Sequence, residues 1–417
     1  MTFSRTEQFP RGAWAGLLMF VAAATPLRHM APAALLWAAP CLLFASLAIT
    51  WGAESAQFFI AQGFALAILA WLQTFPEFAV EAVLAWHQQV PFLFANLTGA
   101  LRMLTGLGWP MIYFAAAHVH RKRTGEPLRE IRLLPEHSVE VVGLLASLVY
   151  ASFILWKSSL HLYDSVVLAG VYAVYLFTLS KMPPQKEEGM EDLERIPRAI
   201  VCSPRLRRII LITLCFAAGG ALIYFTAEPF LGGLMAVALW LGIPSFVFIQ
   251  WVAPFVSEFP EMASTFYWAR TVTRAPMALM NMVSSNINQW TLLVAMLPVV
   301  YSLSRGSVSG FALDDRQKLE VAMTIGQAFV GMLFLINMQL TWWEASVLFV
   351  LWAVQFVLSA VTPDEGGQGI GHTVHLSITV IYFVWAAWEL LRLLMSRRKP
   401  LAFVQFAQMW REHVWGT

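Results

Sequence analysis

Two short stretches of the chain place a proline and carboxylates inside long apolar runs. The first reads Phe75-Pro76-Glu77, and the second reads Ser257-Glu258-Phe259-Pro260-Glu261. Proline has no N–H and interrupts a helix, which leaves backbone carbonyls without partners. A carboxylate in an apolar layer costs about 2.5–3.5 kcal/mol on insertion scales unless a positive partner offsets it. Residues of these types in this pattern indicate a site that binds protons or cations.

Oxygen-bearing side chains near the two Pro-Glu turns could complete such a site, because a hard cation such as Ca²⁺ takes about six to eight oxygen ligands. Glu81 follows Glu77 by one helical turn on the same face, where it could extend the acidic track as a relay or line a solvated entrance. A simpler alternative is that both turns are only kinks whose acids form salt bridges. The predicted ion ligands are Glu77, Glu261, Glu258, Thr74, Ser257, Asn96, Asn281, Ser285 and Gln289.

Arg102 lies in the same apolar region and is effectively always charged. An arginine within a membrane span is expected to pair with a carboxylate, and the acidic cluster is close in the sequence. Two interpretations remain open. Arg102 either tunes the charge of the site as a tethered cation, or faces the membrane surface or a cytoplasmic vestibule.

The composition predicts a polytopic membrane protein. The 417 residues are 59% hydrophobic and 12% charged, with a mean hydropathy of +0.64, which leaves too little polar surface for a soluble domain of this size. A net charge of +2 gives no reason to expect a nucleic-acid partner. Phosphate-binding glycine loops, nucleophile elbows and zinc-protease motifs are not found in the sequence. We therefore expect neither an enzyme nor a cofactor, and the expected partners are the lipid bilayer and inorganic cations.

Basic residues set the expected orientation. They gather in the links 118–137 and 182–207 and in the tail after Met395, which the positive-inside rule places in the cytoplasm. We expect an integral protein of the cell (inner) membrane, with Tyr301–Lys318 outside. The start of the chain, with its apolar stretch 14–24, could be a secretory signal, and a retained leader or short helix is favoured. Spans are predicted at 31–61, 64–88, 91–117, 138–157, 159–181, 208–238, 243–269, 275–303, 320–338, 343–361 and 372–396.

An internal repeat organises these spans. Residues 75–101 can be laid over 259–287, which matches the two Pro-Glu pairs and, after one gap, Asn96 with Asn281. Each copy lies in the second and third spans of a five-span block, and an odd number of spans inverts the second block. The fold class is thus all-α, with two inverted five-helix repeats and an extra C-terminal transmembrane helix. The predicted divisions are 1–30 (leader), 31–181 (first repeat), 182–207 (linker), 208–361 (second repeat) and 362–417 (extra helix and tail).

These motifs resemble the alpha repeats of the sodium/calcium exchanger family, within the calcium/cation antiporter superfamily. The resemblance rests on the paired Pro-Glu turns and the Asn-containing motifs that follow them. It implies alternating-access exchange of Ca²⁺ against Na⁺ or H⁺, with Glu77 and Glu261 as the central ligands of Ca²⁺ or Na⁺.

The sequence departs from the family pattern in the first repeat. Where the family reads Gly-Ser-Asn, this chain reads Gly99-Ala100-Leu101, and a further polar position falls on Leu104, whereas the second repeat offers Gln289. The first half-site has therefore lost oxygens. A tethered Arg102 would take part of a former Na⁺ position and shift coupling toward protons.

The sequence predicts a secondary antiporter, with Ca²⁺ exchanged for Na⁺ or H⁺. Two rivals stay open: a Na⁺(K⁺)/H⁺ exchanger in which Glu258 and Glu261 share protons, and a non-transporting membrane protein that keeps the exchanger fold. The oligomeric state is not predicted.

Overall fold

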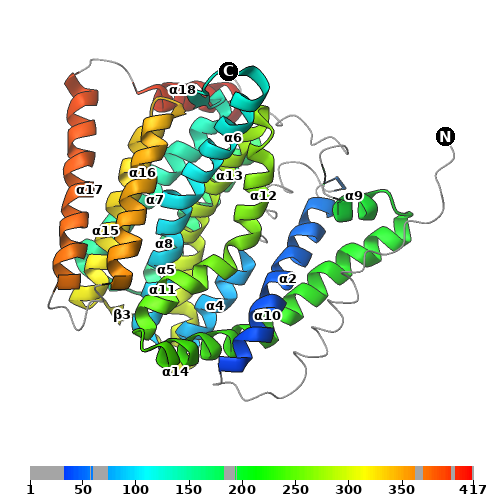
Figure 1. The fold of residues 1–417 in the computed structure, drawn as a ribbon, viewed down its shortest axis with the longest axis vertical. Helices are drawn as coiled ribbons and strands as arrows, with labels where there is room; N and C mark the ends of the chain where they lie inside the picture. The colour runs from blue at the N-terminus through cyan, green and yellow to red at the C-terminus, as the bar shows by residue number, and fades with distance from the viewer. Residues whose placement is uncertain are drawn as a thin grey trace.

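The computed structural model describes residues 32–56, 58–59, 74–182, 193, 195–361, 370–395 and 400–415. The predicted leader over 1–30 lies outside these residues, as does most of the segment before the first Pro-Glu turn. The described part is a helical bundle with four short strands (Figure 1). It agrees with the predicted all-α membrane fold.

Local signals explain where the helices of the first half begin and end. Pro76 and Pro91 stand in the first turns of their helices, where a missing N–H removes no helical hydrogen bond. Gly125 ends its helix in the left-handed conformation, with φ of 79°. The elements are α2 (Pro32–Ala56), α4 (Phe75–Trp86), α5 (Val90–Met103), the π-helical turn η1 (Leu104–Gly108), α6 (Trp109–Thr124), β1 (Glu130–Arg132), η2 (Pro135–His137), α7 (Ser138–Lys157), β2 (Ser159–Leu160) and α8 (Leu162–Lys181).

The second half repeats this order after a short helix in the predicted linker. It begins with a long helix of 37 residues and continues through a broken one. The elements are α9 (Arg195–Val201), α10 (Arg205–Leu241), α11 (Ser245–Ser257), α12 (Phe259–Ala269), η3 (Val272–Arg274), α13 (Ala275–Asn288), the π-helical turn η4 (Gln289–Leu293), α14 (Val294–Arg305), β3 (Phe311–Ala312), α15 (Asp315–Leu335), β4 (Gln339–Thr341), α16 (Trp342–Val361), α17 (Ile370–Met395), α18 (Leu401–Met409) and η5 (Trp410–Val414).

The described helices fit nine of the predicted spans, while the first part of the predicted span 64–88 lies outside the described residues. Nine of them are long and apolar enough to cross a membrane, and α11 is a shorter apolar helix. The third span runs further than predicted, because α6 continues to Thr124 and carries His118, His120 and Arg121 on its last turns. Basic side chains there interact favourably with the negative end of the helix dipole, which explains the extension.

The predicted span 243–269 is broken at its proline. α11 ends at Ser257, α12 begins at Phe259, and Pro260 and Glu261 occupy its first turn. α4 begins in the same way, with Pro76 and then Glu77. Each acid therefore stands at a helix N-terminus, where the dipole favours negative charge.

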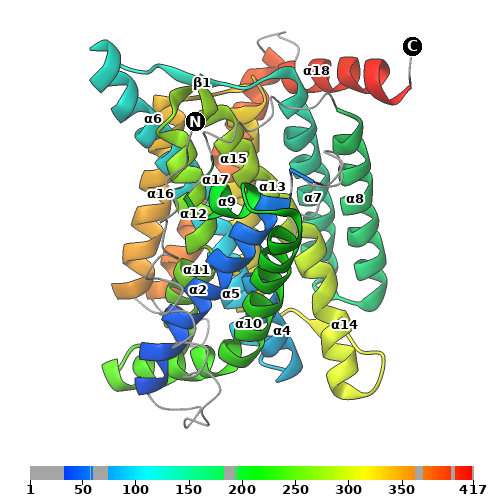
Figure 2. The same cartoon turned by 90° about the vertical axis from the view of Figure 1, so that its right-hand side faces the viewer.

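Contacts between the two halves come in pairs in which the equivalent helices have changed places. The equivalent helices are, in order, α2, α4, α5, α6, α7 and α8 of the first half and α10, α12, α13, α14, α15 and α16 of the second. α4 packs on α14 as α12 packs on α6, and α5 packs on α15 as α13 packs on α7. α6 packs on α16 as α14 packs on α8, while α2 contacts α10 and α7 contacts α15. β1 pairs with β4 and β2 pairs with β3, at opposite ends of the molecule (Figures 1 and 2). This pattern is what the predicted inverted repeat requires.

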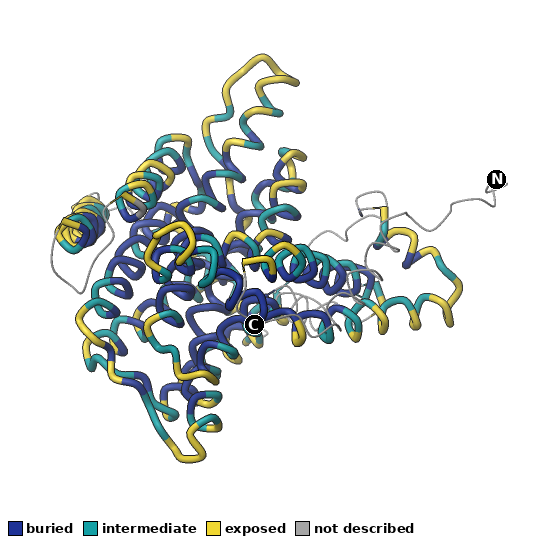
Figure 3. Tube along the Cα trace, turned by 60° about the horizontal axis from the view of Figure 1, so that its bottom comes forward, coloured by how far each residue is buried: buried dark blue, intermediate teal, exposed yellow. Residues whose placement is uncertain are grey.

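Two C-terminal helices lie outside this paired pattern. α17 packs on α15 and α16 and corresponds to the predicted extra helix, and α18 packs on α7 and η2. α18 lies at the same end as β1 (Figure 2). Figure 3 shows the buried trace concentrated in the middle of the bundle, with exposed hairpin tips. The site described below lies in this buried region.

Candidate cation-binding site

Glu77 is held at the start of α4 by an amide on α5. Asn96 Nδ2 donates hydrogen bonds to Glu77 Oε1 at 2.6 Å and to Glu81 Oε1 at 3.0 Å. Glu77 and Glu81 are 1% and 0% exposed. Glu81 therefore belongs to the buried acidic track and does not line a solvated entrance.

Glu258 and Glu261 flank the second break and are also buried. Ser285 Oγ on α13 donates to Glu261 Oε2 at 2.7 Å, and the Gln289 amide donates to Glu258. The two carboxyl groups lie within hydrogen-bonding reach of each other. Two carboxyl groups can share a hydrogen bond only when one of them carries a proton.

The side chains of the two Pro-Glu turns belong to one cluster. Ser257, the last residue of α11, donates a hydrogen bond to Glu77 Oε2. Asn288, the last residue of α13, donates to Thr74, the residue before α4. Glu258 also lies near enough to Glu77 for their charges to interact. The two Pro-Glu turns therefore lie together inside the bundle, as the repeat predicts.

Several oxygens of this cluster are buried without a donor. Leaving a buried acceptor unsatisfied costs about 1–3 kcal/mol, and a bound cation or proton would remove that cost. Across the part of the chain that the structure describes, no Lys, Arg or His forms a salt bridge with any of the four carboxylates. The described residues therefore give no support to the alternative of kinks whose acids form salt bridges. The oxygens without a hydrogen-bonding partner are Glu81 Oε2, Asn96 Oδ1, Asn288 Oδ1 and Gln289 Oε1.

The carboxylates alone do not form a complete metal cage. No three Asp, Glu, His or Cys side chains in the described ranges converge on one point that a metal ion could occupy. Ca²⁺ needs more oxygens than two or three carboxylates supply. Amide, hydroxyl and backbone oxygens must complete the ligand set, and the donor-free amide oxygens of Asn96, Asn288 and Gln289 fit this need.

Arg102 does not pair with these acids. Its Nη1 lies 2.6 Å from Glu320 Oε2 on α15, and both side chains are buried. His375 Nδ1 on α17 lies 2.9 Å from Glu320 Oε1. The prediction that Arg102 pairs with a carboxylate is correct. Its partner is a different carboxylate, and the surface location is wrong because Arg102 is 0% exposed.

The network around Glu320 joins four helices. Gln250 Nε2 on α11 donates to Glu320 Oε2 at 2.8 Å, and Arg102 Nε on α5 donates to the Thr98 carbonyl at 3.1 Å. The sequence interpretation missed Glu320, Gln250 and the role of His375. An acid at the start of a predicted span and a glutamine inside an apolar one were the available signals.

The structure places the matched residues Asn96 and Asn281 in different surroundings. Asn281 corresponds to Asn96, yet its Nδ2 is buried without a hydrogen-bonding partner among the described residues. Ser285, one turn further along α13, contacts Glu261 instead. The alignment is nevertheless consistent at the π-helical turns, because Leu104 and Gln289 are matched and each begins one.

Two acids at the starts of helices outside the site form local hydrogen bonds. Asp164 accepts from the backbone N–H of His161 at 2.7 Å, and Glu344 accepts from that of Thr341 at 2.7 Å. These two acids cap α8 and α16, which are equivalent helices.

A helical membrane protein in which two helices that begin with Pro-Glu turns bring buried carboxylates together has the arrangement typical of secondary cation transporters. The sequence matches the family described as "Sodium/calcium exchanger protein" over residues 30–181 and 211–361. The chain belongs to this family, whose members exchange cations. A comparison with curated proteins finds no match.

Solved structures share the fold. The crystal structure of the H⁺/Ca²⁺ exchanger CAX is 28% identical, with a TM-score of 0.84 over 97% of this chain and 99% of that chain. The sodium-calcium exchanger NCX_Mj is 17% identical, with a TM-score of 0.52 over 81% of this chain and 99% of that one. Native YfkE is 11% identical, with a TM-score of 0.54 over 89% and 98%. The last two show the fold alone.

Proposed function

We propose that the protein exchanges Ca²⁺ for H⁺ by alternating access, across the inner membrane of the cell. The observation that carries this proposal is the single buried cluster of four carboxylates that joins both Pro-Glu turns. Buried carboxyl groups this close together repel one another when they are ionised, so they require protons or other positive partners. Mobile cations must supply that charge, since the structure describes no basic side chain that pairs with them.

Three observations favour H⁺ over Na⁺ as the coupling ion. The Glu258 and Glu261 carboxyl groups lie within hydrogen-bonding reach of each other, so the pair is arranged to hold a proton. The first repeat lacks side-chain oxygens at Gly99-Ala100-Leu101 and at Leu104. The H⁺/Ca²⁺ exchanger CAX resembles this chain over nearly the whole length of both chains. Arg102 is engaged by Glu320, so we do not assign it the role of a tethered cation.

The exchange follows from charge balance. Ca²⁺ bound by Glu77, Glu261 and neighbouring oxygens neutralises two negative charges. When Ca²⁺ leaves, protons on the carboxyl groups must replace it, because ionised and empty carboxylates are not tolerated in the apolar interior. Only the loaded forms can then reorient. The contact between Ser257 and Glu77 joins the two halves of the site, so both halves respond to the same ion.

Flux into liposomes tests the proposal. Purified protein is reconstituted, and uptake of radioactive Ca²⁺ is measured under an imposed pH gradient and, separately, an imposed Na⁺ gradient. We expect the pH gradient to drive uptake and Glu261→Gln to abolish it. Glu126→Gln, an exposed acid in the loop after α6, is the matched control and should transport normally.

Each outcome bears on a different part of the proposal. Uptake driven only by Na⁺ would show that the coupling ion is wrong while Ca²⁺ exchange is right. No uptake under either gradient would overturn Ca²⁺ exchange itself. Full activity of Glu261→Gln would remove the site from the mechanism.

A further inference from the structure

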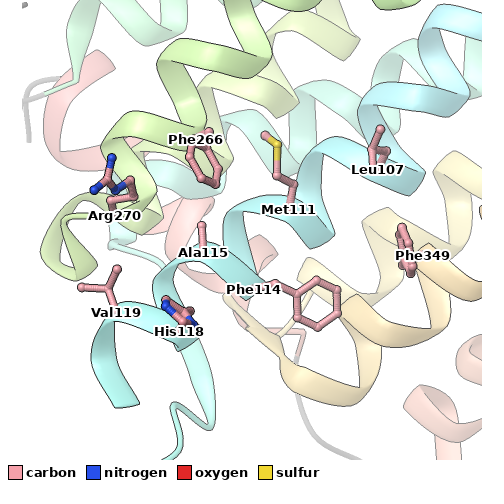
Figure 4. A pocket seen from close by; sticks show the side chains of 9 residues that line it. All are labelled: Leu107, Met111, Phe114, Ala115, His118, Val119, Phe266, Arg270 and Phe349. Carbon is pink, nitrogen blue, oxygen red and sulfur yellow. The ribbon is translucent and has the colours of Figure 1, made fainter. Parts of the chain in front are cut away.

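An apolar cavity lies between α6, α12 and α16, away from the carboxylate cluster. Its volume is about 430 Å³. Figure 4 shows Arg270 and His118 at one end of it, and Leu107 and Phe349 at the other. The cavity is therefore apolar, with two basic side chains at one end. Its lining residues are Leu107, Met111, Phe114, Ala115, His118, Val119, Phe266, Arg270 and Phe349.

A second, more polar cavity adjoins the first at His118, which lines both. Its volume is about 720 Å³, and Arg121 and Arg129 line it together with Trp342 and Trp343. Tryptophan is enriched where a protein meets the headgroup layer of a membrane. This cavity is formed by the end of α6, β1 and the start of α16, the end of the molecule that the positive-inside rule assigns to the cytoplasm.

The basic groups at these two cavities are available to an anionic ligand. Within the described ranges no salt bridge involves Arg121, Arg129 or Arg270. Glu130 also lines the second cavity, but its carboxylate is held by Arg132 at 2.5 Å. The balance of free charge at the junction of the cavities is therefore positive.

We propose that these joined cavities bind one anionic phospholipid, with an acyl chain in the apolar cavity and the headgroup phosphate between Arg270, His118 and Arg121. Basic pockets between transmembrane helices on the cytoplasmic side suit anionic headgroups. A free phosphate would leave the apolar cavity unfilled, and a zwitterionic lipid would bring a cationic headgroup close to the guanidinium groups. A phospholipid with a net negative headgroup matches both parts.

The position of this lipid gives it a route to the ion site. Phe266 lies on α12 and Arg270 directly follows its last residue, Ala269, and α12 begins with the Pro260 and Glu261 turn. Leu107 lies in the π-helical turn that follows α5. A lipid seated here would contact two elements that shape the carboxylate cluster. The inference does not depend on which ions are exchanged.

Thermal unfolding of the full chain in a neutral detergent tests the lipid site. The probes are dioleoyl phosphatidylglycerol, dioleoyl phosphatidylcholine and soluble glycerol phosphate. We expect phosphatidylglycerol alone to raise Tm by several degrees in a saturable way. The double variant Arg121→Ala with Arg270→Ala should lose this shift. Lys122→Ala with Arg123→Ala removes the same charge from exposed positions of α6 that line neither cavity, and should keep it.

A second variant separates the lipid from charge effects. Ala115→Trp fills the apolar cavity and leaves every basic group in place, so it should also lose the phosphatidylglycerol shift. Equal shifts with phosphatidylcholine, or a shift with glycerol phosphate that matches phosphatidylglycerol, would overturn the proposal. A phosphatidylglycerol shift retained in both Ala115→Trp and the Arg121/Arg270 double variant would also overturn it.

Discussion

Glu140 and Glu320 are equivalent residues of the two halves in opposite situations. Leu160 and Leu340 occupy matching positions in the two strand pairs. Glu140 precedes Leu160 by as many residues as Glu320 precedes Leu340, so the same alignment of the two halves pairs Glu140 with Glu320. Glu320 is paired with Arg102. Glu140 is 3% exposed, and its Oε2 has no hydrogen-bonding partner in the described part of the chain. When the two repeats are aligned, Ile287 occupies the position of Arg102. Glu140 therefore has no arginine at the position from which Arg102 pairs with Glu320.

The two glutamates should therefore respond differently to the same substitution. Glu320→Gln leaves the Arg102 guanidinium buried without a counter-charge, and we expect a loss of about 3–5 kcal/mol of stability. Glu140→Gln removes an uncompensated acid and should be neutral or stabilising. Thermal unfolding followed by tryptophan fluorescence compares the variants. Equal destabilisation by both would contradict the assigned pairing.

Ser285 and Asn281 provide a second matched pair, one turn apart on α13. Ser285 bonds Glu261, whereas Asn281 Nδ2 has no partner among described residues. Losing a hydrogen bond to a charged group costs about 1.5–3 kcal/mol, so Ser285→Ala should weaken Ca²⁺ affinity roughly tenfold to a hundredfold. Asn281→Ala should change it little. The apparent KM for Ca²⁺ uptake is the measurement. A larger effect of Asn281→Ala than of Ser285→Ala would instead support Asn281 as the ligand, as the repeat alignment predicts.

At the scale of helices, the sequence predicts what depends on local signals and misses what depends on tertiary contacts. Hydropathy places the spans, and proline places the break between α11 and α12, because both act within a few residues. The partner of Arg102 lies on α15, far along the chain, and spacing cannot reveal it. Ser285 and Asn281 are both predicted ligands, and of the two it is Ser285 that contacts Glu261, because the rotation of a helix about its axis decides which of two neighbouring turns faces the acid.

Close contact between α5 and α11 depends on one glycine. A Cβ added at Gly99 would lie 1.9 Å from the Gln250 carbonyl oxygen, so Gly99→Ala must push the two helices apart. We expect lower thermal stability and a large loss of Ca²⁺ transport, because α11 carries Ser257 into the site. Gly170 on α8 has no atom within 4 Å of such a Cβ, and Gly170→Ala should gain up to about 1 kcal/mol from helix propensity. Normal transport by Gly99→Ala would show that this contact does not position the site.

At the scale of the whole molecule, the exchanged contacts and the two strand pairs are what we expect of halves that run in opposite directions through the membrane. Composition and an odd number of spans per block lead to this arrangement from the sequence alone. The role of α17 could not be predicted, since it lies outside the repeat and reaches the core through His375 and Glu320. The extra helix therefore contacts the second half, which gives the two halves unequal surroundings.

The inverted arrangement makes a prediction about which loops face which side. Glu126, near β1, should be cytoplasmic, and Ser307, near β3, should be outside, because the two strand pairs lie at opposite ends of the molecule. Both residues are exposed. In a background lacking Cys41, Cys202 and Cys215, Ser307→Cys should react with a membrane-impermeant maleimide in intact spheroplasts. Glu126→Cys should react only after permeabilisation.

The labelling experiment contains its own control, since both cysteines must react once the membrane is opened, and the cysteine-free protein must retain Ca²⁺ uptake. Reaction of both cysteines in intact spheroplasts would place the two loops on one side. The halves would then run in the same direction, and the two Pro-Glu turns could not approach a shared site from opposite faces of the membrane. Alternating access at the carboxylate cluster requires that approach, because each face must be able to open to the same ions.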